Sequence, residues 1–317
     1  MALLLQMQEF ITRTVVLKRY LQVKKEVTVM YNNDLAKRMK QYEAVPKNVL
    51  MRRMPVIMRI DGRAFHTFTR GFVRPFDNLL NKTMQETMKY LCENIQGCVL
   101  GYTQSDEISL VLIDYQRLTS DAWFDNEVQK MCSVGASIAT MAFNKFFHIN
   151  FDEWGEFNIP YWDIGGTNDH VPDDLMKLCN TYDKACKKGA MFDCRVFNLP
   201  KEEVTNYIYW RQLDASRNSI QMVGQANFSH NELQNKSCND IQDMLMTLKG
   251  INWNDLPTYQ KRGSCCIKDV ETVAKYSIDL DGAVVSVLHS KWTIDDNIPI
   301  FKGADRDYIN RLVMTGE

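Results

Sequence analysis

Two stretches of this sequence, residues 55–66 and residues 101–113, constrain the fold more than any other part of the chain. The first is a short apolar run that ends on Asp61 and is followed by Gly62, so Asp61 is predicted at the carboxyl end of a buried strand. The second has a polar tip between two apolar arms, which predicts a β-hairpin. If the hairpin pairs beside the first strand, Asp61 and Asp106 meet at one edge of one sheet.

Two carboxylates at one sheet edge suit magnesium and phosphate chemistry. Carboxylates, backbone carbonyls and amides are the groups that a pair of Mg²⁺ ions and a nucleoside triphosphate require, and Gly62 lets the backbone come close to a ligand. Strand alternation puts Asp106 and Glu107 on opposite faces, so only one of them shares a face with Asp61. We choose Asp106 as the ligand and give Glu107 a supporting role. An acidic hairpin tip is commonly just solvated, but the strand-terminal acid before it favours the site.

Composition allows this site but adds little to it. The chain has 317 residues, enough for one large domain or two ordinary ones, and its 45% apolar share is ordinary for a globular protein. A net charge of −1 gives no global basic signal, so a nucleic-acid contact must use a local patch. The nine cysteines contain no Cys-x-x-Cys pair, which favours reduced thiols over disulfides or zinc. No apolar run approaches the ~20 residues of a membrane helix, so we expect a cytoplasmic protein without membrane contact.

Residues 1–29 differ from the rest of the chain. Their apolar start is too short for a signal peptide and lacks its basic residues. Two explanations stay open: a basic amphipathic targeting helix, and an over-called start, because residues 24–27 can be encoded by a purine-rich stretch that contains a bacterial ribosome-binding sequence. We hypothesise that translation normally starts at Met30. The intact mass of the natively expressed protein tests this, and a species that retains residue 1 would reject it.

Downstream of Met30 the pattern mixes strands and helices. Helices are predicted at residues 33–43, 77–95, 127–147, 173–186, 202–229 and 241–248, and further strands at 192–200, 264–267, 283–288 and 291–294, the last two as a final strand pair. The order strand, helix, hairpin, helix indicates an α+β fold: a ferredoxin-like polymerase palm, an antiparallel sheet with helices packed on one face, plus helical and loop-rich additions. We assign residues 30–150 to the catalytic palm region, 151–190 to a loop-rich insertion with one short helix, and 191–317 to a C-terminal part with the final palm strand and an RNA-facing helix.

Phosphate-binding candidates lie on both sides of the first strand. The backbone amides of Gly62 to His66 are predicted to cradle phosphates, and residues 65–77 mix aromatic and basic side chains. Before the strand, the basic residues Lys47, Arg52 and Arg53 indicate either a solvated connection or phosphate contact, and we weigh the two equally.

Polar residues on the predicted helix at 202–229 allow two interpretations. Arg211 and Asp214 lie three residues apart, which is typical of an ion pair on a helix surface. Arg217 and Asn218 are instead candidates to face a phosphate or a base.

Four motifs lie in order along the chain: Asp61-Gly62-Arg63-x-Phe65-His66, Gln104-Ser105-Asp106-Glu107, Phe192-Asp193-x-Arg195 and Trp210-Arg211-Gln212. Together they resemble the tRNA-histidine guanylyltransferase superfamily, whose members are reverse polymerases that add nucleotides to RNA 5′ ends. The resemblance covers roughly residues 30–267, including the basic turn Lys261-Arg262-Gly263. Each motif alone is moderately specific, and four in order over one chain are specific.

The resemblance implies a role for each motif. It implies catalytic residues Asp61, Asp106 and Glu107, and two Mg²⁺ ions held by Asp61, Asp106 and the Gly62 carbonyl. The implied binding site for ATP and for GTP or another nucleoside triphosphate consists of Asp61, Gly62, Arg63, Ala64, Phe65, His66, Ser105 and Asp106, with Arg74 where the family has a phosphate-contacting basic residue. We predict tRNA contacts at Arg211, Arg217, Asn218, Lys261 and Arg262. A homotetramer is expected by analogy with the family.

The implied chemistry has two stages. A 5′-monophosphate on tRNA is first activated with ATP, and the 3′-hydroxyl of an incoming triphosphate then attacks the adenylylated end. Members dedicated to histidine tRNA carry a His-Ile-Asn-Asn-Leu-Tyr-Asn run where this chain has residues 216–222, and only Asn218 matches. This departure resembles the guanylyltransferase-like branch, which prefers templated addition, so repair of 5′-truncated tRNA is favoured over dedicated addition of one guanosine. Two rival functions are another palm enzyme, such as a nucleotide cyclase or forward polymerase, and a non-catalytic tRNA-binding module.

Overall fold

The computed structural model describes residues 12–24, 34–159, 172–278 and 284–316. The part of the chain up to Asn48 forms one unit, in which residues 12–24 are helical and helix α2 (Asp34–Ala44) has no buried residue. Helix α2 confirms the predicted helix at residues 33–43. None of the helices in the ranges given above is long and apolar enough to span a membrane.

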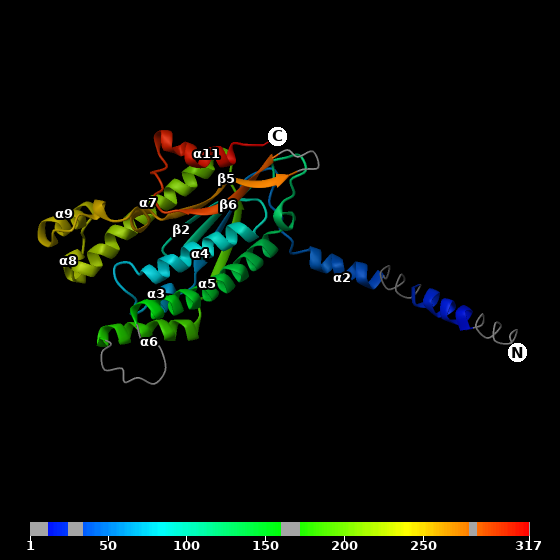
Figure 1. Ribbon diagram of the computed structural model, residues 1–317, viewed down its shortest axis with the longest axis horizontal. Helices are drawn as coiled ribbons and strands as arrows, with labels where there is room; N and C mark the ends of the chain where they lie inside the picture. The colour runs from blue at the N-terminus through cyan, green and yellow to red at the C-terminus, as the bar shows by residue number, and fades with distance from the viewer. Residues whose placement is uncertain (1–11, 25–33, 160–171, 279–283, 317) are drawn as a thin grey trace. The chain divides into compact units, whose positions relative to one another are not determined.

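The second unit, residues 49–317, is built on a six-stranded antiparallel sheet with the order β4-β1-β3-β2-β5-β6 (Figure 1). Its strands are β1 (Val56–Gly62), β2 (Cys98–Gln104), β3 (Glu107–Leu112), β4 (Phe192–Asn198), β5 (Ser264–Ile278) and β6 (Val284–Asp295). Strands β1 to β4 alternate with helices α4 (Asn78–Asn94) and α5 (Val128–Asn158) in the order β-α-β-β-α-β, which is the ferredoxin-like arrangement. The predicted α+β fold with a palm-like sheet is confirmed.

Helices α4 and α5 cover one face of the sheet with a core rich in aromatic side chains. Met58 and Ile60 of β1 are fully buried on this face, beneath Met88 of α4 and Phe143 of α5. The ring of Phe65, in the short helix α3 (Phe65–Phe68), packs 5.4 Å from that of Phe143. This packing fixes the loop after β1 against the core. The Asp77 side chain accepts a hydrogen bond from the Leu80 amide and so begins α4 as its N-cap, as predicted.

The opposite face of the sheet is also covered by helices, which the prediction of helices on one face did not include. Ile57 of β1 packs there with Val204 and Ile208 of α7 (Lys201–Asn227) and with Ile309 of α11 (Asp307–Val313), which follows the 3₁₀ turn η3 (Gly303–Arg306). The two faces have separate cores because successive residues of each strand point to opposite sides.

A third apolar cluster joins the second half of α7 to the helices that follow it. These are α8 (His230–Leu233), α9 (Cys238–Lys249), η2 (Trp253–Asp255) and α10 (Thr258–Arg262). Val223, Phe228 and Leu245 are buried in this cluster, and Phe76 from the loop before α4 packs against it. The cluster therefore ties that loop to α7 and α9.

Two secondary-structure predictions are wrong. The loop-rich insertion predicted from residue 151 is wrong at its start, because α5 continues to Asn158, whereas the short helix predicted within it at residues 173–186 is confirmed as α6 (Asp173–Lys188). The Trp154 ring of α5 packs 5.2 Å from that of Tyr182 in α6, so both ends of this segment contribute to the core. The predicted turn at Gly165–Gly166 lies outside the described residues. The predicted final strand pair is a single strand, β6, which pairs with a β5 longer than predicted.

Candidate active site

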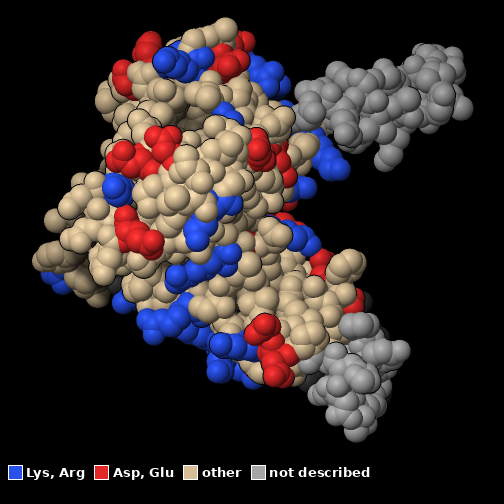
Figure 2. Space-filling view, turned by 90° about the vertical axis from the view of Figure 1, so that its left-hand side faces the viewer, with Lys and Arg blue, Asp and Glu red and all other residues tan. Residues whose placement is uncertain are grey.

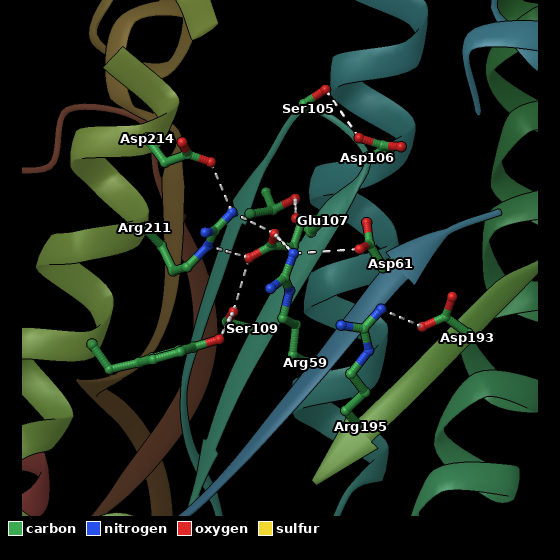
Figure 3. Close-up of polar contacts among 12 residues, drawn as sticks. Arg59, Asp61, Ser105, Asp106, Glu107, Ser109, Asp193, Arg195, Arg211 and Asp214 are labelled. Atoms are coloured by element: carbon green, nitrogen blue, oxygen red, sulfur yellow. Dashed lines mark hydrogen bonds and ion pairs between the residues drawn. The ribbon is translucent and has the colours of Figure 1, made fainter. Parts of the chain in front are cut away.

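A backbone hydrogen bond joins the end of β1 to the tip of the β2–β3 hairpin. The hairpin turns through Ser105 and Asp106, and Ser105 has a φ of 51°, the positive value that a type II′ turn requires at its first central position. The Gly62 amide donates to the Asp106 carbonyl at 3.0 Å. The side chains of Asp61 and Asp106 accordingly lie near each other at one end of the sheet (Figure 3). The predicted convergence of these two acids is confirmed.

The positive charge beside these two acids is on Arg59, which pairs with Asp61 and not with Asp106. Arg59 Nη2 lies 3.4 Å from Asp61 Oδ2, and Ser105 Oγ donates to Asp106 Oδ1 at 3.2 Å. Within the described ranges, no Lys, Arg or His forms an ion pair with Asp106. Burial raises the pKa of Asp106, and the nearby charge of Asp61 adds to this rise. A partly buried carboxylate beside a second carboxylate is a site that attracts a cation.

Glu107, the next residue along the chain, has the opposite surroundings. Its side chain is 4% exposed, and Arg211 binds both of its oxygens, Nε donating to Oε1 at 2.7 Å and Nη2 to Oε2 at 2.6 Å. Arg59 Nη2 lies 2.8 Å from Oε2 on the other side. Burial raises the pKa of Glu107 and the two guanidinium groups oppose that rise. Burial alone would lower the pKa of Arg211, but the bond to Glu107 raises it, as in other bidentate arginine–carboxylate pairs.

Strand alternation was the wrong reason for choosing Asp106 and not Glu107 as the ligand, although the choice itself fits the geometry. Directly opposite residues of an antiparallel ladder point to the same face, and the residue opposite Asp61 is Glu107. Asp106 belongs to the turn, so strand alternation does not determine where its side chain points. The turn itself brings Asp106 to Asp61.

Sequence reasoning missed Arg59, which connects the two pairs of charges. Arg59 lies two residues before Asp61 on β1, so both side chains project from the same face. One of its amino groups contacts both Asp61 and Glu107, while its Nε is buried with no hydrogen-bond partner in the described part of the chain. The period-two spacing of Arg59 and Asp61 could have predicted that Arg59 lies beside Asp61.

The loop after β1 offers three free backbone amides. The Gly62 amide donates a hydrogen bond to the Asp106 carbonyl, and the Arg63 amide donates to the Met191 carbonyl at 2.8 Å. The amides of Ala64, Phe65 and His66 donate to no acceptor in the described ranges, and Ala64 has a φ of 53°. Successive free amides next to a left-handed residue form a concave site for an anion.

The side chains of this loop divide into buried and exposed groups. Phe65 is 5% exposed and belongs to the core, so only its backbone remains available for the predicted nucleotide contact. Arg63, His66 and Arg74 are exposed, and residues 62–76 contain no Asp or Glu. Figure 2 shows Lys and Arg side chains gathered in a band across the lower half of one face of the molecule. The net charge of −1 therefore conceals a local basic surface.

Arg211 does not fit the predicted tRNA contact. It is 4% exposed, its guanidinium is bound to Glu107 and Asp214, and it lies 4.6 Å from the centre of the Trp210 ring. The predicted ion pair with Asp214 exists, but Arg211 is a buried residue of α7 and not a surface one. These contacts favour a structural role for Arg211, which holds Glu107 in place.

The other predicted tRNA-contacting residues remain accessible in part. The side chain of Arg217 is 62% exposed and pairs with Asp214, and Asn218 is half-buried beside it. Lys261 and Arg262 are half-buried on α10, where the Lys261 ammonium donates to a neighbouring backbone carbonyl. Burial lowers the pKa of Lys261, and the charge of Arg262 lowers it further. The tRNA contacts of these four residues remain a prediction.

The donor set at the end of β1 suits magnesium better than a metal held by protein ligands alone. In the part of the chain that the structure describes, no group of three or more His, Cys, Asp and Glu side chains is arranged to hold a metal ion. Magnesium is commonly held by one or two carboxylates, with the phosphates of a substrate and water completing its coordination. Asp61, Asp106 and the adjacent backbone carbonyl match that requirement.

Comparisons with known proteins show what this chain is similar to. The family model described as tRNAHis guanylyltransferase matches residues 36–200. A bacterial tRNA(His) guanylyltransferase-like protein, solved in complex with ATP, is 41% identical; the match covers 88% of this chain and 99% of that one, with a TM-score of 0.68. A structure described in the same words, in complex with GTP, is 38% identical over 89% of this chain and 99% of that one, with a TM-score of 0.65. The Saccharomyces cerevisiae tRNA(His) guanylyltransferase is 24% identical over 232 residues, which cover 68% of this chain and 84% of that protein.

Proposed function

The chain belongs to the tRNAHis guanylyltransferase family of 3′-to-5′ nucleotidyltransferases, and from this premise we propose that it repairs the 5′ ends of tRNA by templated nucleotide addition. Its relatives solved with ATP and with GTP support both triphosphates as substrates. The observation that carries the proposal is the pair Asp61 and Asp106, two carboxylates brought together without a cation to neutralise Asp106. Family membership also argues against the rival cyclase, the forward polymerase and the non-catalytic module.

We assign metal binding and phosphate binding to different residues of the site. Asp61, Asp106 and the Gly62 carbonyl would hold two Mg²⁺ ions, which lower the pKa of an attacking hydroxyl and neutralise the leaving phosphate. The free amides of Ala64 to His66 are placed to bind phosphate oxygens, and the exposed Arg63 and Arg74 add positive charge. Positioning and charge neutralisation are most of what this chemistry needs from a protein.

Glu107 is better suited to positioning than to chemistry. Both of its oxygens are bound by guanidinium groups, so it has little capacity left for a metal or a proton. Through Arg59 it stabilises the position of Asp61. We assign Glu107 and Arg211 to the support of the site.

The resemblance to the family implies two bond changes. A 5′-phosphate oxygen of the RNA first attacks the α-phosphorus of ATP and expels pyrophosphate. The 3′-hydroxyl of the incoming triphosphate then attacks the RNA 5′-phosphorus and expels AMP, so that the chain grows by one nucleotide at its 5′ end. The departure at residues 216–222 from members dedicated to histidine tRNA supports the templated form of this reaction.

One experiment tests the proposal. A 5′-labelled tRNA that lacks its first nucleotide is incubated with the protein, ATP, Mg²⁺ and each triphosphate in turn. Extension only by the nucleotide complementary to the opposing base is expected. Addition of guanosine whatever the template would instead identify a dedicated histidine-tRNA enzyme. The predicted homotetramer is tested separately by light scattering on the purified protein.

A further inference from the structure

Two rows of charged side chains cross one face of the sheet, near the end of β1 (Figure 3). In the first row, Asp61 of β1 lies directly opposite Glu107 of β3 and Asp193 of β4. In the second row, two residues earlier on β1 and on the same face, Arg59 lies directly opposite Arg195 of β4. Like charges directly opposite each other destabilise a sheet. Each row is therefore stable only if the other row or a neighbouring element supplies the opposite charge.

The three acids of the first row do not share the positive charge equally. Glu107 has the bidentate arginine of α7, and Asp193 pairs with Arg195 at 3.6 Å. Within the described ranges, Asp61 forms its ion pair with Arg59 alone. The Nη2 atom of Arg59 lies 2.8 Å from Glu107 but 3.4 Å from Asp61, and charge-assisted bonds of this kind usually measure about 2.7–2.9 Å. Asp61 is therefore the acid of this row whose charge is neutralised least.

The guanidinium of Arg59 is held less firmly than that of Arg211. Arg211 donates through both Nε and Nη2 and binds Glu107 and Asp214. In the part of the chain that the structure describes, Arg59 makes its hydrogen bond and ion pairs through Nη2 alone, and its Nε is buried without a partner. A buried donor without an acceptor costs free energy. Of these two arginines, Arg59 is therefore the one that can change partners at little cost.

We propose that Arg59 is a built-in counter-ion of Asp61, which a divalent cation replaces when it binds that carboxylate. A cation on Asp61 and the guanidinium of Arg59 repel each other, and Glu107 already holds the same amino group at the shorter distance. Arg59 thus keeps Asp61 in position before the metal binds and lowers the affinity of the site for the metal. Because it acts through Asp61, Arg59 is a positioning residue. The inference rests on the proposed function in one respect, the assignment of Asp61 as a metal ligand.

The sign of one measurement separates a counter-ion from a residue that only supports the site. If Arg59 only oriented Asp61, its loss should weaken metal binding, as the loss of groups that orient a metal ligand commonly does. A counter-ion competes with the metal, so its loss removes a repulsion and should strengthen metal binding. A general loss of packing cannot produce tighter binding at Asp61.

The test is Mn²⁺ binding to the full-length protein without nucleotide or RNA, with free Mn²⁺ followed by electron paramagnetic resonance. Arg59→Gln removes the charge but keeps a hydrogen-bond donor, and it should bind Mn²⁺ about tenfold more tightly than the wild type. Arg59→Lys keeps the charge, so its affinity should stay within about twofold of the wild type. Unfolding midpoints in EDTA check that each variant folds, and Arg59→Met is a second neutral variant with the same expected result.

Arg195→Gln is the matched control. Arg195 lies directly opposite Arg59, but it is 61% exposed and pairs with Asp193, so its loss should change the affinity for Mn²⁺ by less than about twofold. If Arg59→Gln binds Mn²⁺ no more tightly than the wild type, or if Arg195→Gln gains as much, the counter-ion proposal is overturned and the metal assignment stands. Asp61→Asn should lose this binding. If it binds Mn²⁺ as the wild type does, the metal assignment fails, and the counter-ion proposal fails with it.

Discussion

Asp106 and Glu107 are adjacent in the chain, yet their surroundings are opposite. Glu107 is buried under α7 with both oxygens bound by guanidinium groups. Asp106 lies one residue away at the hairpin turn, where its main polar contacts are the Ser105 hydroxyl and the charge of Asp61. The ladder ends between them: Glu107 is the first residue of β3, and Asp106 is outside it.

This difference indicates which acid acts on a substrate and which one supports the fold. A buried carboxylate with a bidentate partner is satisfied, and further binding would have to displace a strong pair. A carboxylate held beside another one is destabilised until a cation arrives. Sites that bind or react commonly keep such unfavourable arrangements, which the rest of the structure must stabilise.

The largest expected effect is on activity when either acid of the Asp61–Asp106 pair is neutralised. Asp61→Asn and Asp106→Asn should each lower the rate of nucleotide addition by about 10³-fold or more, because a metal site worth several kcal/mol in the transition state is lost. The far-UV circular dichroism spectrum should not change. Single-turnover addition to 5′-truncated tRNA in Mg²⁺ measures the effect.

Asp193 provides a sharp control for that experiment. It lies directly opposite Asp61 on β4 and is 57% exposed, so it belongs to the same row of the sheet. Asp193→Asn should retain most of the activity, because the segment that carries Asp106 lies on the other side of β1. An equal loss in Asp193→Asn would contradict the assignment of the metals to Asp61 and Asp106.

The second expected effect is on stability and falls on the buried pair. Arg211→Met should lower the free energy of unfolding by about 3–5 kcal/mol, because it leaves the Glu107 carboxylate buried without its main partner. Replacing both members, as Glu107→Leu/Arg211→Met, should restore much of that loss. Urea denaturation monitored by tryptophan fluorescence measures these values.

An exposed ion pair tests whether burial is the cause. Lys82 and Glu153 are in contact, but their side chains are 49% and 58% exposed. Lys82→Met should change the free energy of unfolding by less than about 1 kcal/mol. Similar costs for Lys82→Met and Arg211→Met would show that the contact matters, and that burial does not.

A smaller effect is expected where β1 meets the phosphate loop. A Cβ added at Gly62 would lie 2.2 Å from the Phe65 ring, and this ring is fixed in the aromatic core. Gly62→Ala should cost about 1–3 kcal/mol of stability, as overpacking usually does, and should displace the free amides that follow. Thermal unfolding and the KM for the triphosphate measure the two consequences.

Gly303 is the matched glycine for this substitution. A Cβ there has no neighbour within 4 Å, although its φ of 60° favours glycine. Gly303→Ala should cost about 1 kcal/mol through the backbone alone and should leave KM unchanged. A change in KM for Gly303→Ala would show that the assay reports general destabilisation.

The main features of the fold followed from local patterns in the sequence. The apolar run before Asp61, the hairpin and the helical stripe after Asp77 predicted β1, β2, β3 and α4, because each has a period that only one kind of element satisfies. The same alternation places the adjacent residues Cys265 and Cys266 of β5 in the two different cores. The second helical layer was missed because α7 is polar at many positions, and its apolar residues meet the sheet only through strand residues that are distant in sequence.

The site was predicted less completely, because its charges are paired through tertiary contacts. The partner of Glu107 is Arg211, 104 residues later in the chain, and no spacing rule joins two residues across that distance. The pattern therefore assigned Arg211 to the surface and left Arg59 out. The turn geometry that brings Asp106 to Asp61 was hidden for a different reason: alternation describes strands, and a two-residue turn interrupts it.

The smallest expected effect links the Asp106 site to stability without any metal. An acid whose pKa is raised in the folded protein binds its proton more tightly there than in the unfolded chain. The raised pKa of Asp106 therefore makes the metal-free protein less stable as the pH rises through and above the ordinary value of 3.8. Asp106→Asn removes this penalty, so at pH 7 in EDTA the variant should be more stable than the wild type by about 0.5–1 kcal/mol.

The pH dependence and the response to Mg²⁺ identify the cause of that difference. Well below pH 3.8 the carboxyl is protonated in both the folded and unfolded states, so the advantage of Asp106→Asn should disappear. Added Mg²⁺ should raise the unfolding midpoint of the wild type and not that of the variant, because only a ligand that binds the folded state stabilises it. If Asp106→Asn is no more stable than the wild type at pH 7 in EDTA, then Asp106 carries no penalty, and the contrast between it and Glu107 is one of exposure alone.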